Sequence, residues 1–227
     1  MTMNGVTGRM LHRAFERLCD VVGACAGLLF LMPVFAGLAL VVLWNDGPPV
    51  LFSQTRVGRN GKPFRIWKFR TMCVGRQGSV ITAAGDDRIT RVGAAIRRCK
   101  LDELPQLFNV LKGDMSLIGP RPEVPEHVQL EEPLWQAVLQ VRPGVTDLAS
   151  LLYREEEKIL GKSRDPNIFY RESILPAKLR LNLAYLQSRS FRKDLRLIFL
   201  TIRYSLFPKK FDQDLIQRTF GTGAGMA

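Results

Sequence analysis

Residues 101–123 are LDELPQLFNVLKGDMSLIGPRPE, a stretch that decides the local fold around two adjacent acids. A helix tolerates proline only in its first turn, so Pro105 places the start of a helix near Asp102 or Glu103. A rigid Gly-Pro-Arg-Pro turn follows and carries Arg121. The stretch therefore combines two carboxylates at a helix start with a guanidinium held in a stiff turn.

Asp102 and Glu103 are the candidate catalytic pair. The unpaired amides and the dipole at a helix N-terminus keep carboxylates ionised and attract phosphate, by about 0.3 to 1 kcal/mol at exposed positions. Neighbours on a helical turn diverge, so one acid can face a phosphorus atom while the other holds Mg²⁺. The competing interpretations are a helix-capping acid pair and, for Arg121, a structural salt bridge in place of bidentate phosphate binding.

Composition limits the class of protein. A chain of 227 residues with 46% hydrophobic content can bury one ordinary core and leaves little room for a second domain. The net charge of +12 predicts an anionic partner, whether nucleic acid, lipid headgroups or a phosphorylated substrate. The four cysteines form no CxxC pair, so neither a disulfide framework nor a zinc site is indicated. With two histidines in the chain, acid chemistry falls to carboxylates.

The segment 21–44 carries no charge and, at about 24 residues, is long enough to span a bilayer. Pro33 lies near its middle and removes a backbone hydrogen bond, which predicts a bend there. Basic residues, which favour the cytoplasmic side, flank both ends, so a re-entrant helix bent at Pro33 fits better than a single kinked span. The flanking cations are Arg9, Arg13, Arg17, Arg56, Arg59, Lys62, Arg65, Lys68 and Arg70.

The remaining pattern predicts an α+β fold that is mostly helical. Extended segments at 50–57 and 64–72, joined through Asn60-Gly61, indicate a small β-hairpin. Gly113 predicts the end of the helix that follows the two acids. Helical spacing of apolar residues predicts further helices over 89–99, 150–161, 174–188 and 191–207.

The helix expected over 191–207 is strongly amphipathic. Its apolar residues could face the core or a membrane interface, and core packing is favoured for most of them. The predicted organisation is an N-terminal membrane segment over 1–46, a cytoplasmic catalytic domain over 47–210 and a flexible tail over 211–227. The apolar residues of the amphipathic helix are Leu195, Ile198, Phe199, Ile202 and Leu206.

Four motifs occur in order along the chain: RVGRNGKPFRIWKFRTM, GDDRITRVGAAIRR, the 101–123 stretch and VRPGVTDL. Together they resemble the bacterial sugar transferases, small monotopic polyprenyl-phosphate phosphoglycosyl transferases, from about residue 9 to residue 202. The resemblance implies a re-entrant membrane helix, amphipathic helices at the membrane interface and a Mg²⁺-dependent ping-pong reaction. It also implies that Asp102 carries a covalent phosphosugar and that Glu103 binds Mg²⁺.

The reaction implied by the resemblance starts when Asp102 attacks the sugar-bearing phosphate of a UDP-sugar and releases UMP. Undecaprenyl phosphate then takes up the phosphosugar, in the first membrane step of glycan biosynthesis on the cytoplasmic face of the bacterial inner membrane. Membrane lipids are expected partners and nucleic acid is not, while the donor sugar and homodimer formation are left open. The residues implied to contact phosphates are Lys68, Arg70, Arg97 and Arg121, with Arg142 and Asn182 in a nucleotide or sugar pocket.

The chain departs from the family pattern at three places. Met32-Pro33 stands where many relatives have Ser-Pro, Asp147 and Ser150 occupy a stretch that often continues with Gly and Gln, and Asn182 aligns with a common Asp. Two other functions explain parts of the sequence. A membrane-tethered nucleic-acid-binding protein would account for the basic surface, and a phosphatase or nucleotide-sugar hydrolase would keep the phospho-aspartate but end in water.

Overall fold

Two N-terminal helices, α1 (Met3–Phe30) and α2 (Met32–Asp46), meet at Leu31 with a bend of 60°. The bend expected at Pro33 is therefore present, because α2 restarts with Pro33 in its first turn, where the missing N–H breaks no helical bond. The structure is a computed structural model that describes residues 3–76, 78 and 81–221, with side chains from residue 14 on. The predicted flanking side chains of Arg9 and Arg13 lie outside this description.

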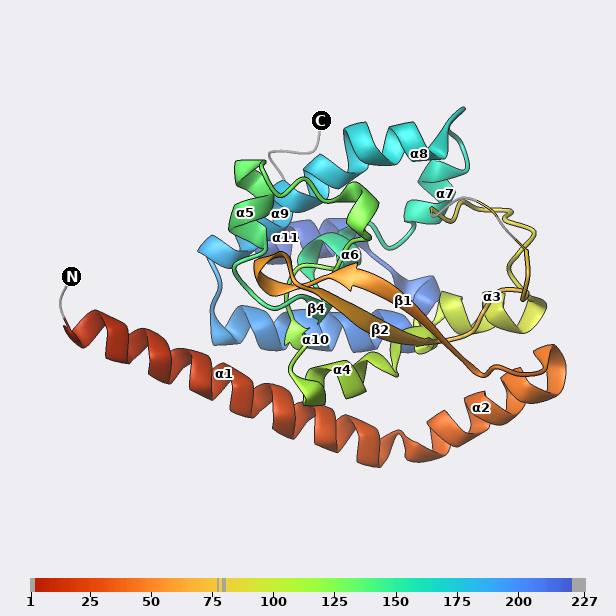
Figure 1. The fold of residues 1–227 in the computed structure, drawn as a ribbon, viewed down its shortest axis with the longest axis horizontal. Helices are drawn as coiled ribbons and strands as arrows, with labels where there is room; N and C mark the ends of the chain where they lie inside the picture. The colour runs from red at the N-terminus through yellow and green to blue at the C-terminus, as the bar shows by residue number, and fades with distance from the viewer. Residues whose placement is uncertain (1–2, 77, 79–80, 222–227) are drawn as a thin grey trace.

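No helix in the described part of the chain is by itself long and apolar enough to cross a membrane. The segments Ala14–Phe30 and Met32–Asp46 meet the length and composition of a span only as a bent pair. Figure 1 shows this pair along one edge of the molecule, with α4 (Gln106–Lys112) and α10 (Phe191–Leu206) lying above it.

The predicted hairpin is confirmed. Strands β1 (Leu51–Val57) and β2 (Pro63–Phe69) pair antiparallel, with Leu51 opposite Phe69, and a 3-10 turn, η1 (Arg59–Gly61), joins them. Asn60 adopts the left-handed conformation that Asn tolerates better than most side chains, with φ of 58°. The Asn-Gly signal thus identified the correct turn.

A second, parallel strand pair was not predicted. Strand β3 (Ser116–Ile118) pairs in parallel with β4 (Gly144–Thr146), which is far along the chain, and each strand is only three residues long. Gly119 directly follows β3 and packs closely against Gly144. A Cβ added to Gly144 would lie only 2.1 Å from the Gly119 nitrogen. Glycine at both positions allows the two backbones to pack directly against each other, just before the turn that carries Arg121.

Two helix predictions need correction. The helix expected over 150–161 is two short ones, because Asp147 caps the first and the chain turns after Leu152 before the second begins. The tail expected to be flexible contains α11 (Gln213–Phe220), which Asp212 caps and whose Ile216 is fully buried; residues 222–227 lie outside the described part. The other helices are α3 (Arg91–Arg98), η2 (Leu101–Glu103), η3 (Pro125–His127), α5 (Pro133–Val138), α6 (Leu148–Leu152), α7 (Glu156–Leu160), α8 (Pro166–Phe169), η4 (Tyr170–Ile174), α9 (Leu175–Gln187) and η5 (Pro208–Lys210).

Helix α10 presents one face to the core and another to the surface. Leu197, Leu200 and Tyr204 are buried in a cluster shared with α6 and α11. The prediction of core packing is wrong for most of the apolar stripe, because the buried face is rotated away from it. The exposed residues are Leu195, Phe199, Ile202 and Leu206, whereas Ile198 packs partly against the cluster.

Two polar contacts fix α1 to the domain above it. Asp20 Oδ1 accepts hydrogen bonds from Ser116 Oγ at 2.9 Å and from the Leu117 nitrogen at 2.8 Å. Arg17 donates to the carbonyls of Val110 and Leu111 at the C-terminal end of α4, where helix carbonyls lack intrahelical donors. The bent pair is thus attached to the helix that follows the two acids.

Candidate active site

Asp102 and Glu103 lie on the 3-10 turn η2, just before Pro105 and α4. The prediction that an α-helix begins at the two acids is therefore corrected, because Pro105 occupies the N-cap and α4 starts at Gln106. Both acids are buried, with exposed fractions of 6% for Asp102 and 8% for Glu103. Because burial disfavours a charged carboxylate, the hydrogen-bond and ion-pair partners of each acid determine the direction in which its pKa shifts.

Glu103 is enclosed by cations from two distant parts of the chain. Lys68 of β2 places Nζ 3.3 Å from Glu103 Oε1. Arg121, in the turn after β3, donates one N–H to Oε1 at 2.5 Å and a second to Oε2 at 3.2 Å. Burial alone would raise the pKa of Glu103, but Arg121, Lys68 and Lys100 outweigh it and hold this pKa well below its usual value.

Asp102 has the opposite environment. Its Oδ1 is buried and has no hydrogen-bond partner among the described residues. Burial, followed by the charge of Glu103, raises the pKa of Asp102 above the ordinary aspartate value. The helix start was expected to favour the ionised form of both acids. The pKa of Glu103 is lowered as expected, whereas desolvation at Asp102 exceeds the help from nearby cations and raises its pKa.

Lys68 and Arg121 also differ from each other. Burial lowers the pKa of Lys68 to about 8, although Glu103 acts to raise it. The charge of Glu103 raises the pKa of Arg121 despite burial, so this guanidinium stays cationic. The site therefore holds one permanent cation and one whose charge is lost near pH 8.

Asn109 fixes the distance between the hairpin and the acid-bearing segment. Its side-chain amide donates to the Arg65 carbonyl at 2.7 Å, and its Oδ1 accepts from the Trp67 nitrogen at 3.1 Å. A fully buried asparagine that bonds to a strand backbone positions that strand, and here it holds Lys68 over Glu103. Asn109 was not predicted as a site residue. The feature that could have indicated its role is a polar amide among the apolar residues of a short helix.

The other predicted phosphate-binding cations have protein partners of their own. Arg70 donates through one nitrogen to the carbonyls of Asp46 and Gly47, while its buried Nε and Nη1 have no partner within the described part of the chain. Arg97 pairs with Glu157, and its charge is felt at Asp102. Phosphate binding by Arg70 and Arg97 stays a prediction.

Arg142 and Asn182 are not brought to the two acids by any contact of the described residues. Arg142 donates from Nε to the carbonyl of Gly113, at the end of α4 opposite Asp102. Asn182 is buried on α9. Their assignment to a nucleotide or sugar pocket stays a prediction.

No group of three or more His, Cys, Asp or Glu side chains forms a ready metal site in the described structure. Glu103 can nevertheless serve as one ligand, since Oε1 accepts from two cations but Oε2 accepts from one, and a carboxylate oxygen has about two lone pairs. Mg²⁺ commonly binds through one or two carboxylates together with substrate phosphates. The residues present therefore fit Mg²⁺ that arrives with a phosphorylated substrate.

A second buried acid, Glu123, lies two positions after Arg121. Tyr170 donates its hydroxyl to Glu123 Oε1 at 2.6 Å, and Arg56 and His127 face Oε2 at 3.8 and 3.7 Å. Burial alone would raise the pKa of Glu123, but His127, Lys178 and Arg56 outweigh it and lower this pKa to about 2. Both oxygens of Glu123 thus have partners.

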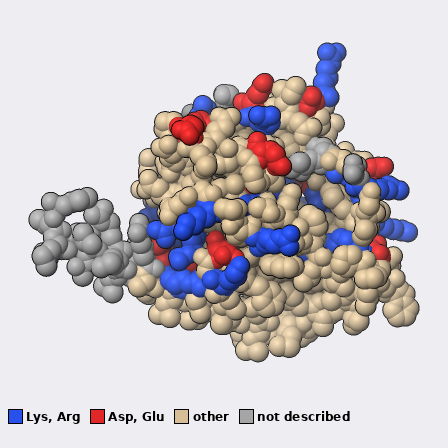
Figure 2. Space-filling model, viewed as in Figure 1, with Lys and Arg blue, Asp and Glu red and all other residues tan. Residues whose placement is uncertain are grey.

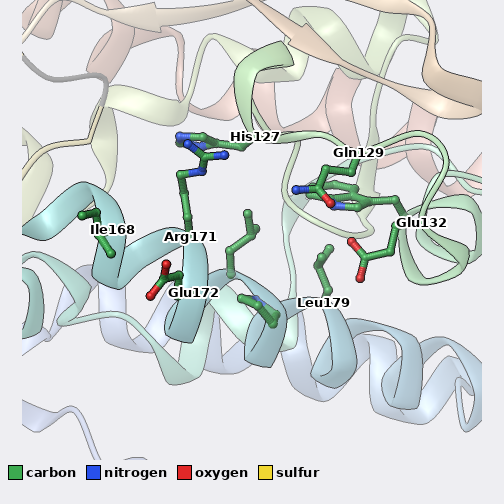
Figure 3. A pocket seen from close by; sticks show the side chains of 10 residues that line it. His127, Gln129, Glu132, Ile168, Arg171, Glu172 and Leu179 are labelled. Carbon is green, nitrogen blue, oxygen red and sulfur yellow. The ribbon is translucent and has the colours of Figure 1, made fainter.

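A cavity of about 310 Å³ lies on the far side of this centre, between η3, α5 and the α8–α9 segment. His127 and Trp135 line it, and Figure 3 shows Arg171 projecting from the helix of η4 toward the His127 side. Asp102, Glu103, Lys68 and Arg121 are absent from its lining. The cavity is therefore separate from the acid pair.

The fold and the site define a class of protein: an α+β domain on a bent apolar helix pair, with a buried carboxylate pair held by cations. The family model described as bacterial sugar transferase matches residues 11–208. The chain belongs to this family.

Relatives differ in how much of their length the chain covers. A UDP-glucose:undecaprenyl-phosphate glucose-1-phosphate transferase of Escherichia coli K12 is 36% identical over 198 residues, 85% of this chain and 40% of the relative. A UDP-N-acetylgalactosamine-undecaprenyl-phosphate N-acetylgalactosaminephosphotransferase of Aeromonas hydrophila is 35% identical over 85% of this chain and 44% of the relative. A putative undecaprenyl-phosphate N-acetylgalactosaminyl 1-phosphate transferase of Bacillus subtilis is 45% identical over 55% of this chain and 69% of the relative. The chain thus spans less than half the length of two of these three relatives.

Proposed function

We propose that this protein transfers a sugar-1-phosphate from a UDP-sugar to undecaprenyl phosphate, through a phosphosugar held covalently on Asp102. The observation that carries the proposal is Asp102 Oδ1, a buried oxygen without a partner in the described structure, next to a cation-bound Glu103. The names of the relatives, which join sugar phosphates to undecaprenyl phosphate, support the same reaction. They favour it over nucleic-acid binding, the rival suggested by charge.

The proposed reaction has two displacements at one phosphorus atom. An oxygen of ionised Asp102 attacks the sugar-bearing phosphorus of the donor, the bond to the bridging oxygen breaks, and UMP leaves with that oxygen. A phosphate oxygen of the acceptor then attacks the same phosphorus. The acyl-phosphate bond breaks, Asp102 is regenerated as a carboxylate, and a polyprenyl-diphosphate sugar is formed.

The two acids divide the work according to their surroundings. A desolvated carboxylate without hydrogen bonds is the better nucleophile, which suits Asp102. Glu103 stays ionised and holds Lys68 and Arg121 in place through hydrogen bonds. From there their positive charges would stabilise the charge that develops on the phosphate. Glu103 with the donor phosphates would hold Mg²⁺, which when bound neutralises phosphate oxygens.

We propose further that the bent pair enters and leaves one leaflet, with the domain on the cytoplasmic face of a bacterial inner membrane. The apolar side chains of α2 support this, since Trp44 is 91% exposed and Leu40 and Leu43 are exposed as well. Figure 2 shows the lower edge of the molecule, over α2 and the end of α1, without charged side chains in that view, and cations gathered above it. Such an apolar edge below a basic surface is typical of proteins seated among anionic lipid headgroups.

The product, a lipid-linked sugar, would start a glycan such as an exopolysaccharide, O-antigen, capsule or glycoprotein glycan. The full-length protein in membranes, given undecaprenyl phosphate and a panel of UDP-sugars, should release UMP with one donor and form a lipid-extractable sugar. With donor alone, mass spectrometry should find a phosphosugar on the peptide that contains Asp102. Sugar phosphate released to water, with no lipid product, would instead identify a hydrolase. Product formation without any adduct would contradict the covalent mechanism.

A further inference from the structure

Helix α4 lies in the concave angle between α1 and α2, as Figure 1 shows. Leu107 packs toward α1, where a Cβ added to Gly27 would lie 3.0 Å from its Cδ1. The next residue, Phe108, faces α2, with its ring centroid 6.1 Å from that of Phe35. Phe35 in turn lies 5.6 Å from Phe69 of β2, which is buried. We call Phe35, Phe69 and Phe108 the aromatic cluster.

Phe108 is the exposed member of the aromatic cluster. Its side chain is 53% exposed, although its neighbours Leu107 and Val110 are buried against α1. A phenyl ring that stays half exposed while its neighbours on the same helix are buried is accessible to an apolar ligand. The exposed ring of Phe108 is thus a candidate surface for an apolar ligand.

The aromatic cluster and the charged centre are built on the same elements, since both take residues from β2 and from the segment that runs from η2 into α4. Phe69 directly follows Lys68, whose ammonium group contacts Glu103. Phe108 lies six residues after Asp102, in the first turn of the helix α4 that follows the turn η2. An amphiphile whose phosphate reaches Asp102 would therefore lay the first part of its hydrocarbon chain across Phe108.

We propose that Phe108, supported by Phe35, binds the phosphate-proximal part of the acceptor's polyprenyl chain and determines the affinity for the lipid acceptor. This inference rests on the proposed function, in which the acceptor phosphate must come to Asp102. The donor is water-soluble and has no chain to place there. The occupant is therefore the acceptor, because it is the substrate that combines a phosphate with a long hydrocarbon.

The test separates the two half-reactions in lipid nanodiscs that contain full-length protein. Exchange of labelled UMP into the UDP-sugar without acceptor reports the step at Asp102 alone. Titration with undecaprenyl phosphate then gives the acceptor KM. Phe108→Ser should leave the exchange rate unchanged and raise the acceptor KM about tenfold, as expected when a phenyl ring is lost from an apolar contact. Phe108→Leu should recover most of the affinity.

Phe199→Ser on α10 is the matched control, because Phe199 is 62% exposed and lies on a different helix. It should change neither the exchange rate nor the acceptor KM. An unchanged acceptor KM in Phe108→Ser would overturn the proposal. So would equal KM increases in Phe108→Ser and Phe199→Ser, which would show ordinary contact with bulk lipid.

A second measurement does not depend on turnover. A polyprenyl phosphate with a photoreactive group near its phosphate end should label the peptide that contains Phe108, and undecaprenyl phosphate should compete. Labelling elsewhere, or labelling of this peptide without competition, contradicts the proposal. Specific labelling in a protein without UMP exchange would disprove the proposed reaction and keep the acceptor site.

Discussion

Two buried acidic centres of the described structure, one at Asp102 and Glu103 and one at Glu123, differ in how their carboxylate oxygens are paired. At the Glu123 centre both carboxylate oxygens face donors from Tyr170, Arg56 and His127. At the Asp102 centre one buried oxygen has no donor in the described part of the chain. A buried unpaired oxygen costs about 1 to 3 kcal/mol, so it persists where a ligand completes it.

The comparison also separates two neighbours in the sequence. Asp102 and Glu103 are equally buried, yet cations lower the pKa of Glu103 while burial and the charge of Glu103 raise that of Asp102. Pairs of acids with diverging pKa values are typical of catalytic sites. Glu123, with its low pKa and complete partners, is expected to stabilise the fold.

Asp102→Asn should have the largest effect on activity, because it replaces the proposed nucleophile and changes only one oxygen. We expect UMP release to fall by roughly 10⁴-fold or more, with an unchanged thermal unfolding midpoint or a higher one. The rate is measured in membranes and the unfolding in detergent micelles. Near-normal turnover would remove Asp102 from the mechanism.

Arg121→Lys should reduce kcat/KM for the donor by about 10² to 10³-fold. Lysine keeps the charge but loses the paired N–H donors that hold both oxygens of Glu103. Arg59→Lys in the exposed hairpin turn is the control and should leave the kinetics unchanged. Equal kinetics for the two variants would show that Arg121 acts through charge alone.

Lys68→Arg should move the alkaline limb of the pH–rate profile. Because the Lys68 pKa is lowered to about 8, its ammonium group is present below that pH and lost above it. Wild-type kcat/KM for the donor should fall as the pH rises through about 8, whereas arginine stays charged and should extend the plateau by at least about one pH unit. An identical alkaline limb in both proteins would assign it to another group.

Glu123→Gln should act on stability, with a smaller effect on catalysis. Its folded pKa of about 2 lies below the ordinary 4.5, so its stabilisation is present above pH 4.5 and lost as the pH falls toward 2. The shift corresponds to on the order of 3 kcal/mol. The unfolding midpoints of wild type and variant should differ at pH 7 and converge as the pH falls from 4.5 to about 2. A difference independent of pH would indicate lost packing.

Local signals predicted much of the fold. Asn60-Gly61 identified the hairpin turn, Gly113 the end of α4 and Pro33 the neighbourhood of the bend, since each residue restricts its own backbone. Pairing of β3 with β4 was missed, because strands of three residues carry too little pattern to detect. The apolar stripe of α10 was assigned to the wrong surroundings, since amphipathicity does not tell core from an exposed apolar face.

The candidate site was predicted in part. Lys68 and Arg121 were expected to contact phosphates and Glu103 to bind Mg²⁺. The structure joins the three by ion pairs, which was the competing interpretation for Arg121, and the phosphate and Mg²⁺ roles stay predictions. Arg142 donates a hydrogen bond to the Gly113 carbonyl, at the end of α4 farther from Asp102. The residues next to Arg142 in the sequence could not have indicated this partner. Asn109 was missed because its role depends on a strand more than 40 positions away.

The sequence by itself determined that two acids follow one another before a proline-started helix, and that an apolar segment bends ahead of them. Those features depend on backbone restrictions of single residues and on the order of apolar ones. Only the tertiary structure decided which acid has its pKa lowered by cations and which is left with a raised pKa and an unpartnered oxygen. The pKa shifts of Asp102 and Glu103 add up the effects of burial and of nearby charges such as Lys68 and Arg121. These groups come together only when the chain has folded.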